Sequence, residues 1–121
     1  MAPKYRVEYL DPHFAERFAK LPRAAQRRVL ELLGEIANRA PLLGKPCGYR
    51  PSSGNLGDCR KVYFDTREGV EPRYRLVYRV LPGEDDPQTI EVITVGPKFT
   101  ADAAGNRGSI YLRVAELLRR I

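Results

Sequence analysis

Residues 60–81 read RKVYFDTREGVEPRYRLVYRVL, and this stretch decides the fold. Apolar and polar side chains alternate over Arg60–Arg67, and again over Arg73–Leu81, which is rich in Leu, Val and Tyr. Such alternation predicts strands that have two chemically different faces. The residues between them, Gly69–Pro72, carry a turn signal. The stretch therefore predicts two neighbouring antiparallel strands.

One face of this strand pair collects cationic side chains and a tyrosine. Lys61 and Tyr63 share a side of the first strand, while Arg75 and Arg79 share a side of the second. If the apolar sides face the helices, all four lie on one basic face that is open to solvent, with Arg60 flanking it. The apolar sides carry Val62, Phe64, Tyr74, Leu76, Tyr78 and Val80.

Upstream of this pair, the sequence predicts a strand, two helices and a long loop. Lys4–Leu10 alternates apolar and charged residues, which is typical of a strand. Apolar residues then recur at helical spacing over 14–21, and from Arg23 to about Asn38, around a break at Pro22. This arrangement predicts a helical hairpin. Residues 40–59 are rich in Pro, Gly and Ser, so we expect little regular structure there.

Downstream, the pattern predicts one more strand and one more helix. Thr89–Val95 completes an antiparallel meander. A loop of small residues follows over Phe99–Ser109, and Ser109 is a candidate cap for a final helix. The order β-α-α-β-β-β-α predicts a single α+β domain over residues 1–121, with a four-stranded, mainly antiparallel sheet.

The net charge and the few histidines and cysteines limit which partners and which catalytic or metal sites are expected. The chain of 121 residues has 21 Lys+Arg and 15 Asp+Glu, so its formal net charge is +6. A small basic domain favours an anionic partner, most often nucleic acid. One histidine and two cysteines without a CxxC pair disfavour a catalytic triad, a multi-histidine metal site and a zinc finger. We therefore expect no metal ion and no other cofactor.

The sequence carries no sign of a membrane or a secretory segment. No run approaches the roughly 18 apolar residues that a membrane span needs. The first residues, MAPKYRVEYLD, contain no apolar core of a signal peptide. We expect a cytoplasmic protein.

Lysine, arginine and tyrosine on one sheet face suit metal-independent cleavage of RNA, in which a 2′-OH attacks the adjacent phosphate. The cations neutralise charge on the phosphorane and lower the pKa of a neighbouring tyrosine, the direction that a general base needs. Lys98 lies just beyond the third strand, and Tyr111 begins the last helix, so both can approach this face. The same pattern also fits exposed strand residues that serve solubility and cross-strand pairing.

Four segments that follow the helical hairpin in order are GNLGDCRKVYFD, YRLVYRVL, IEVITVGPK and IYLRVAELL. Together they resemble the RelE/ParE superfamily of type II toxin–antitoxin toxins, most closely its RelE branch, over residues 4–121. The resemblance implies a RelE-like, microbial RNase-like fold. It also implies a bacterial endoribonuclease that cleaves mRNA, typically on the ribosome, and so stops translation and growth. The ParE branch, which shares the fold and inhibits DNA gyrase, is the alternative.

The resemblance also implies roles for particular residues. Lys61 matches a basic residue of the first sheet motif, and Arg75 matches the phosphate-binding arginine. Lys98 stands where the family usually has an arginine that acts on the leaving group or the transition state. Tyr111 matches a tyrosine that serves as base or stacks on a base. Tyr63 replaces the second lysine of the first motif and is a candidate for proton transfer. RNA-binding roles are expected for Arg60, Arg79 and Lys45.

The family further implies a protein partner. This partner is an antitoxin, usually encoded beside the toxin, whose chain wraps the toxin and masks its basic groove. The other expected partners are mRNA and the ribosome. We expect no association with a membrane.

Overall fold

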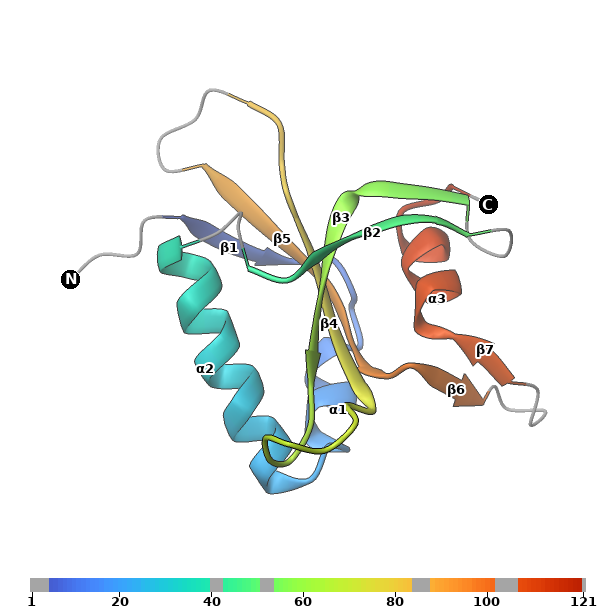
Figure 1. The fold of residues 1–121 in the computed structure, drawn as a ribbon. Helices are drawn as coiled ribbons and strands as arrows, with labels where there is room; N and C mark the ends of the chain where they lie inside the picture. The colour runs from blue at the N-terminus through green and yellow to red at the C-terminus, as the bar shows by residue number, and fades with distance from the viewer. Residues whose placement is uncertain (1–4, 40–42, 51–53, 84–87, 102–106, 121) are drawn as a thin grey trace.

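The computed structural model describes residues 5–39, 43–50, 54–83, 88–101 and 107–120. Three helices and seven strands make up this part of the chain (Figure 1). In chain order they are β1 (Arg6–Tyr9), α1 (Phe14–Ala19), α2 (Arg23–Arg39), β2 (Lys45–Arg50), β3 (Gly54–Phe64), β4 (Tyr74–Val80), β5 (Thr89–Pro97), β6 (Phe99–Ala101), β7 (Arg107–Ser109) and α3 (Ile110–Leu117).

A five-stranded mixed sheet forms the centre of the α+β fold. Its strand order is β1-β5-β4-β3-β2, with β1 parallel to β5 and all other neighbours antiparallel. The expected four-stranded sheet is therefore wrong by one strand. The meander of β3, β4 and β5 and the pairing of the N-terminal strand with a later strand are confirmed.

The extra strand comes from the segment that we expected to be irregular. Residues 45–50 form β2, and residues 54–59 form the first half of β3. Proline and glycine are tolerated here because β2 is an edge strand. The register shifts between Pro46 and Gly48, and Gly48 has a φ of 72°, which marks an irregularity that glycine accommodates.

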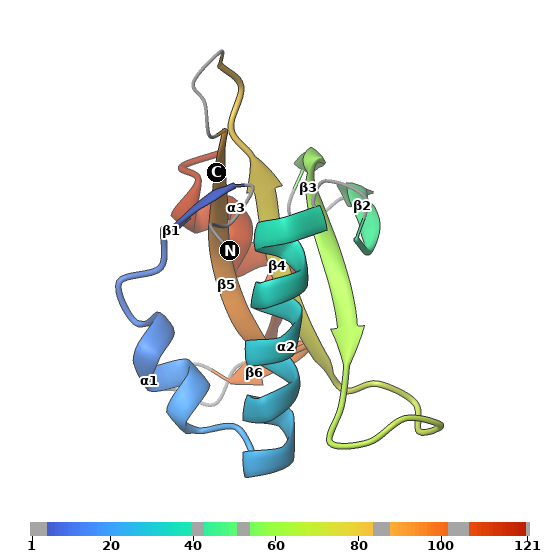
Figure 2. The same ribbon diagram turned by 90° about the vertical axis from the view of Figure 1, so that its left-hand side faces the viewer.

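Helices cover the two faces of the sheet unequally. Figure 2 shows α1 and α2 on one side of the sheet and α3 on the other. The apolar stripe that we predicted for α2 is buried and packs against the apolar sides of β3, β4 and β5. Each fully buried Ile or Leu contributes about 1.5–3 kcal/mol relative to exposure. The predicted stripe consists of Ala25, Val29, Leu32, Leu33 and Ile36, of which Leu33 is only partly buried.

Helix α3 covers much of the face that we expected to be open. Val77 and Ile93 on the sheet are fully buried together with Ile110 and Val114 of the helix. Near one end of this face, Tyr63 remains exposed beside the helix. The expectation that Lys61, Tyr63, Arg75 and Arg79 lie together on a face open to solvent is therefore wrong, because α3 covers the middle of this face.

The helix ends match the sequence prediction in part. Ser109 caps α3, because its Oγ accepts a hydrogen bond of 3.3 Å from the backbone N–H of Leu112. Helix α1 begins at Phe14, as the apolar spacing predicted, but it ends at Ala19; its N-cap residue is His13, whose backbone N–H donates to the Asp11 carboxylate at 2.9 Å.

Within the described ranges, no helix is long and apolar enough to cross a membrane.

Candidate functional site

The candidate site lies where β3 and β4 extend beyond α3. Tyr63 on β3 is paired in register with Arg75 on β4, and Lys61 is paired with Lys45 on β2. Because side chains on paired positions share a face, these four groups project to the same side of the sheet. We call Lys45, Lys61, Tyr63 and Arg75 the Tyr63 cluster.

Three cations surround the ring of Tyr63. The Cζ atom of Arg75 lies 4.0 Å from the ring centroid. The Nζ atoms of Lys61 and Lys45 lie at 5.4 and 5.6 Å. The Tyr63 residue is 40% exposed, so a ligand can reach it. Positive charge is therefore concentrated around one accessible phenol.

This concentration of charge changes the acidity of Tyr63. A hydrogen bond from Lys61 is the main cause that lowers the pKa of the Tyr63 hydroxyl, and partial burial opposes it. The charges of Lys61, Arg75 and Lys45 lower the pKa further. Tyr63 thus loses its proton more readily than an ordinary tyrosine, as a general base requires.

Arg75 is held rigidly at the edge of this cluster. It is only 8% exposed, and its Nη1 donates to the carbonyl oxygens of Pro72 at 2.8 Å and Tyr74 at 3.0 Å. Its buried Nε has no hydrogen-bond partner among the described residues. An unsatisfied buried donor of this kind is costly.

Lys98 approaches Arg75 from the end of β5. Both residues line a pocket of about 450 Å³ together with Pro97 and Phe99. The Nζ of Lys98 lies 5.2 Å from the centroid of the Phe99 ring. The backbone N–H of Lys98 donates to the carbonyl of Arg73 at 2.9 Å, which fixes this strand end against β4. Arg75 and Lys98, which the sequence analysis named separately, therefore line one pocket.

Tyr111 lies beneath the cluster. It is 1% exposed and belongs to the apolar core between α3 and the sheet. The Nζ of Lys61 lies 5.3 Å from the centroid of its ring, so Lys61 contacts both tyrosine rings. This placement makes Tyr63, and not Tyr111, the tyrosine that a ligand meets first.

A glycine that the sequence analysis did not single out positions Lys45. Gly44 has a φ of 81°, a left-handed conformation that favours glycine. A Cβ atom at this position would collide with the carbonyl oxygen of Lys61. The close approach sets the start of β2 directly against β3, opposite Lys61. The only sequence signal for it was the Gly-Lys-Pro turn chemistry of residues 44–46.

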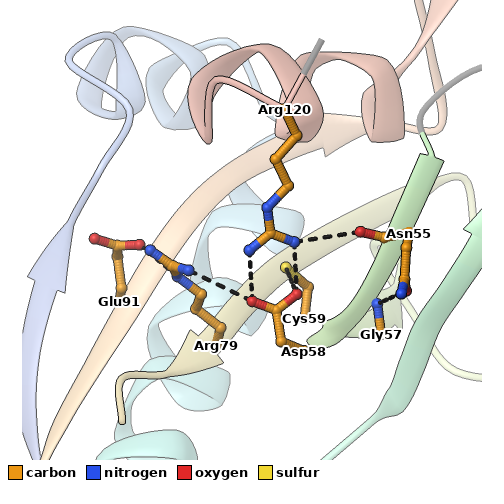
Figure 3. Close-up of polar contacts among 7 residues, drawn as sticks. All are labelled: Asn55, Gly57, Asp58, Cys59, Arg79, Glu91 and Arg120. Atoms are coloured by element: carbon orange, nitrogen blue, oxygen red, sulfur yellow. Dashed lines mark hydrogen bonds and ion pairs between the residues drawn. The ribbon is translucent and has the colours of Figure 1, made fainter. Parts of the chain in front are cut away.

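The other two residues with predicted RNA-binding roles lie elsewhere. Arg60 projects to the opposite side of β3 from Lys61, and its Nε and Nη2 donate to the carbonyls of Leu43 and Gly44 at 3.0 and 2.7 Å. Arg79 lies at the far end of β4, where it donates to Glu91 at 2.8 Å and to Asp58 at 3.4 Å (Figure 3). Neither side chain joins the Tyr63 cluster.

The cations of the cluster lack the acidic partners that other arginines of this protein have. In the described part of the chain, no carboxylate forms an ion pair with Lys45, Lys61, Arg75 or Lys98. By contrast, Asp65 accepts from both Nε and Nη2 of Arg73 at 2.9 and 2.8 Å, which holds the pKa of this aspartate well below its usual range. These four cations therefore have no ion-pair partner among the described residues, although Glu71 lines the pocket that Arg75 and Lys98 share, and such positive charge attracts anions.

Within the described residues, no group of three or more His, Cys, Asp or Glu side chains is arranged to hold a metal ion. No protein-family model, curated protein or solved structure matches the chain.

Proposed function

We propose that this chain is the toxin of a type II toxin–antitoxin module and acts as a metal-independent endoribonuclease of the RelE kind. The observation that carries the proposal is the accessible phenol of Tyr63 within contact range of three cations that have no described acidic partner. Such a group combines a base of lowered pKa with charges that match a phosphorane.

In this proposal, Tyr63 is the general base. Its deprotonated Oη takes the proton of the ribose 2′-OH, and the 2′-oxygen forms a bond to the adjacent phosphorus. The bond from phosphorus to the 5′-oxygen of the next nucleotide breaks. The products are a 2′,3′-cyclic phosphate and a 5′-OH end. The hydrogen bond from Lys61 and the charges of Lys61, Arg75 and Lys45 favour the phenolate, because they lower the pKa of Tyr63.

Arg75 and Lys98 act on the phosphate. A phosphate oxygen in their shared pocket would lie between the guanidinium of Arg75 and the Nζ of Lys98. Because carbonyl oxygens already fix Nη1, the guanidinium needs little reorganisation during the reaction. Lys98 Nζ then donates its proton to the departing 5′-oxygen, so the proton taken by Tyr63 is balanced by the one that Lys98 gives.

The proposal includes the partners that the resemblance implies. The antitoxin would cover the Tyr63 cluster with an acidic segment, because carboxylates can take the place of RNA phosphates beside Lys45, Lys61 and Arg75. The substrate would be mRNA, on the ribosome, in the bacterial cytoplasm. Cleavage there would stop translation and growth.

One experiment tests the proposal directly. The purified protein is incubated with translating ribosomes, and new 5′-OH ends on the mRNA are mapped. We expect cleavage by the wild type and its loss in Arg75→Ala, together with relief of growth arrest when that variant is expressed alone. Absence of RNA cleavage together with gyrase-dependent DNA breaks would overturn the nuclease and support the ParE-like alternative.

A further inference from the structure

A second pocket adjoins the one that holds Arg75 and Lys98. It has a volume of about 390 Å³ and lies between the end of α1, the end of β5 and the first turns of α3. The two pockets share Pro97 and Phe99 as a common wall. We call it the Arg113 pocket, after the arginine that α3 contributes to its wall.

The Arg113 pocket is positively charged. Arg17, Lys20 and Arg113 line it, and none of its described lining residues is Asp or Glu. The charge of Arg17 is neutralised, because its Nε donates to the buried carboxylate of Asp11 at 2.6 Å. Lys20 is exposed at the end of α1. Two cations, Lys20 and Arg113, therefore remain available to an anion.

The guanidinium of Arg113 is held by neutral acceptors only. Its Nη1 donates to Thr94 Oγ1 at 3.2 Å and to the carbonyl of Val95 at 3.4 Å. Burial and the nearby charge of Arg17 lower the pKa of Arg113, while Asp11 and Glu116 act in the opposite direction. Neither carboxylate forms an ion pair with Arg113 in the described part of the chain. Asp11 is linked to Arg113 only through the hydroxyl of Thr94, so an anion bound here would be a direct charged partner of the guanidinium.

The backbone between the two pockets carries no side chain at position 96, which is a glycine. Gly96 is the register partner of Arg75 and also lines the Arg113 pocket. A Cβ atom at Gly96 would come within 3.4 Å of Nη1 of Arg113, so the glycine leaves this guanidinium room beside β5. Arg75 and Arg113 thus approach the same stretch of β5, and no side chain at position 96 separates them.

The wall shared by the two pockets carries an exposed aromatic ring. Phe99 is 57% exposed, and Nζ of Lys98 lies over its ring. Single-stranded nucleic acids bind to such surfaces by stacking bases on aromatic rings, while cations contact the phosphates on either side. An aromatic ring flanked by two cationic pockets is the pattern expected for consecutive nucleotides of one strand.

We infer that the Arg113 pocket binds a second phosphodiester of the RNA strand, one nucleotide step or more from the phosphate held by Arg75 and Lys98. The base between them stacks on Phe99. The inference rests on the proposed function for the position of the first phosphate, and it extends the substrate contacts to residues outside the Tyr63 cluster.

The test measures binding separately from cleavage. The probe is a fluorescein-labelled RNA of about 12 nucleotides whose 2′-OH groups are methylated, a length within the range that single-strand binding sites occupy. Fluorescence anisotropy is recorded over a series of salt concentrations. We expect Arg113→Gln to weaken binding about three- to tenfold and to reduce the salt slope by about 0.7, the value for one phosphate contact on a single strand.

Three further variants make the result specific. Lys20→Gln should also reduce the salt slope, and this exposed residue can be changed without disturbing the interior. Phe99→Ala should weaken binding about fivefold or more through lost stacking and leave the slope unchanged. Arg27→Gln, an equal loss of charge on the exposed face of α2, should leave both quantities at the wild-type values. Wild type and Arg113→Gln should bind a dinucleoside monophosphate, which has one phosphodiester, equally well.

The outcomes separate this inference from the proposed function. If Arg113→Gln and Lys20→Gln both bind the RNA as the wild type does while Arg75→Ala binds it weakly, the second phosphate site is wrong and the first stands. If Arg113→Gln weakens binding but the wild type cuts no RNA on ribosomes, the second site stands and the proposed nuclease is wrong. If a melting scan shows that Arg113→Gln is unfolded, the other two variants test the second phosphate site. A lower salt slope in Lys20→Gln and weaker binding by Phe99→Ala would support it, and wild-type binding by both would overturn it.

Discussion

Both ends of the β3–β4 pair carry arginines, but the two ends differ in whether carboxylates neutralise the positive charge. At one end, where Cys59 is paired with Arg79, the cations have acidic partners. Arg120 donates to both carboxylate oxygens of Asp58 at 2.6 Å, and Arg79 contacts Asp58 and Glu91 (Figure 3). At the other end, where Tyr63 is paired with Arg75, the cations Lys45, Lys61 and Arg75 face a phenol instead, although the neighbouring Arg73 is paired with Asp65.

This difference indicates what each end does. The compensated end ties the C-terminal segment to β3, because Arg120 follows α3 and Asp58 lies on the sheet. The end with Tyr63 concentrates positive charge beside an exposed tyrosine, as the proposed binding of RNA phosphate requires. Changes at the first end should therefore alter stability, and changes at the second should alter activity.

The largest effect is expected at Tyr63. Tyr63→Phe removes the proposed base and should lower the rate of RNA cleavage by about 10²–10⁴-fold. The wild-type rate should rise with pH up to the lowered pKa of Tyr63, because the phenolate is the active form, and the variant should lose this rise. Single-turnover cleavage over a range of pH measures both. Tyr49→Phe, at a tyrosine of β2 that is 72% exposed, is the matched control and should behave as the wild type.

Arg75→Lys should have the next largest effect. Lysine keeps the charge but loses the planar group that stacks on Tyr63 and presents several donors, so we expect cleavage to fall about 10²-fold. The same change at the compensated end, Arg79→Lys, should leave the cleavage rate unaltered. Equal losses of activity in the two variants would contradict the distinction between the two ends of the strand pair.

Lys61→Gln should shift the pH profile of cleavage. Its hydrogen bond is the main cause of the lowered pKa of Tyr63, so its removal should move that pKa up toward the ordinary tyrosine value of about 10. Each unit of this shift lowers the rate at neutral pH about tenfold, and the deficit should shrink at higher pH. Arg23→Gln, at an exposed residue of α2, controls for net charge. A uniform loss of rate at every pH would instead indicate that Lys61 acts on the phosphate.

The smallest effect is expected at the compensated end. Arg120→Gln should lower the free energy of unfolding by about 1 kcal/mol, because the pair with Asp58 is partly exposed to solvent. Arg120 holds the pKa of Asp58 well below its ordinary value, so this stabilisation is present above about pH 4 and is lost as the pH falls further. Urea unfolding at neutral and acidic pH, in a double-mutant cycle with Asp58→Asn, measures it. A cleavage rate that fell with the stability change would contradict a purely structural role.

Much of the fold follows from patterns that can be read along the chain. The alternation in residues 60–81 correctly assigned Val62 and Phe64 to the face that α2 covers and Lys61 and Tyr63 to the other face. A strand exposes its side chains with a fixed period of two, so the assignment needs no knowledge of distant residues. The buried stripe of α2 and the Ser109 cap were predictable for the same local reason.

The site was only partly predictable. Tyr63 and Arg75 were placed together by alternation and register, and the approach of Lys98 follows from its position after β5. Arg79 lies on the same face of β4 as Arg75 but outside the site. Val77, which stands between these two arginines on that face, is buried under α3. The contact of Lys45 with Tyr63 depends on β2, which the Pro- and Gly-rich sequence concealed.

The sequence by itself determined which side chains share a face of a strand and which apolar side chains of the helices are buried. It also determined that the chain carries excess positive charge. These properties depend on local periodicity and on composition. Only the tertiary structure decided which cations are compensated. An arginine becomes part of the scaffold or part of a site according to the carboxylates that distant segments bring to it. Asp58 meets Arg120 across 62 positions of sequence, whereas Arg75 meets the ring of Tyr63.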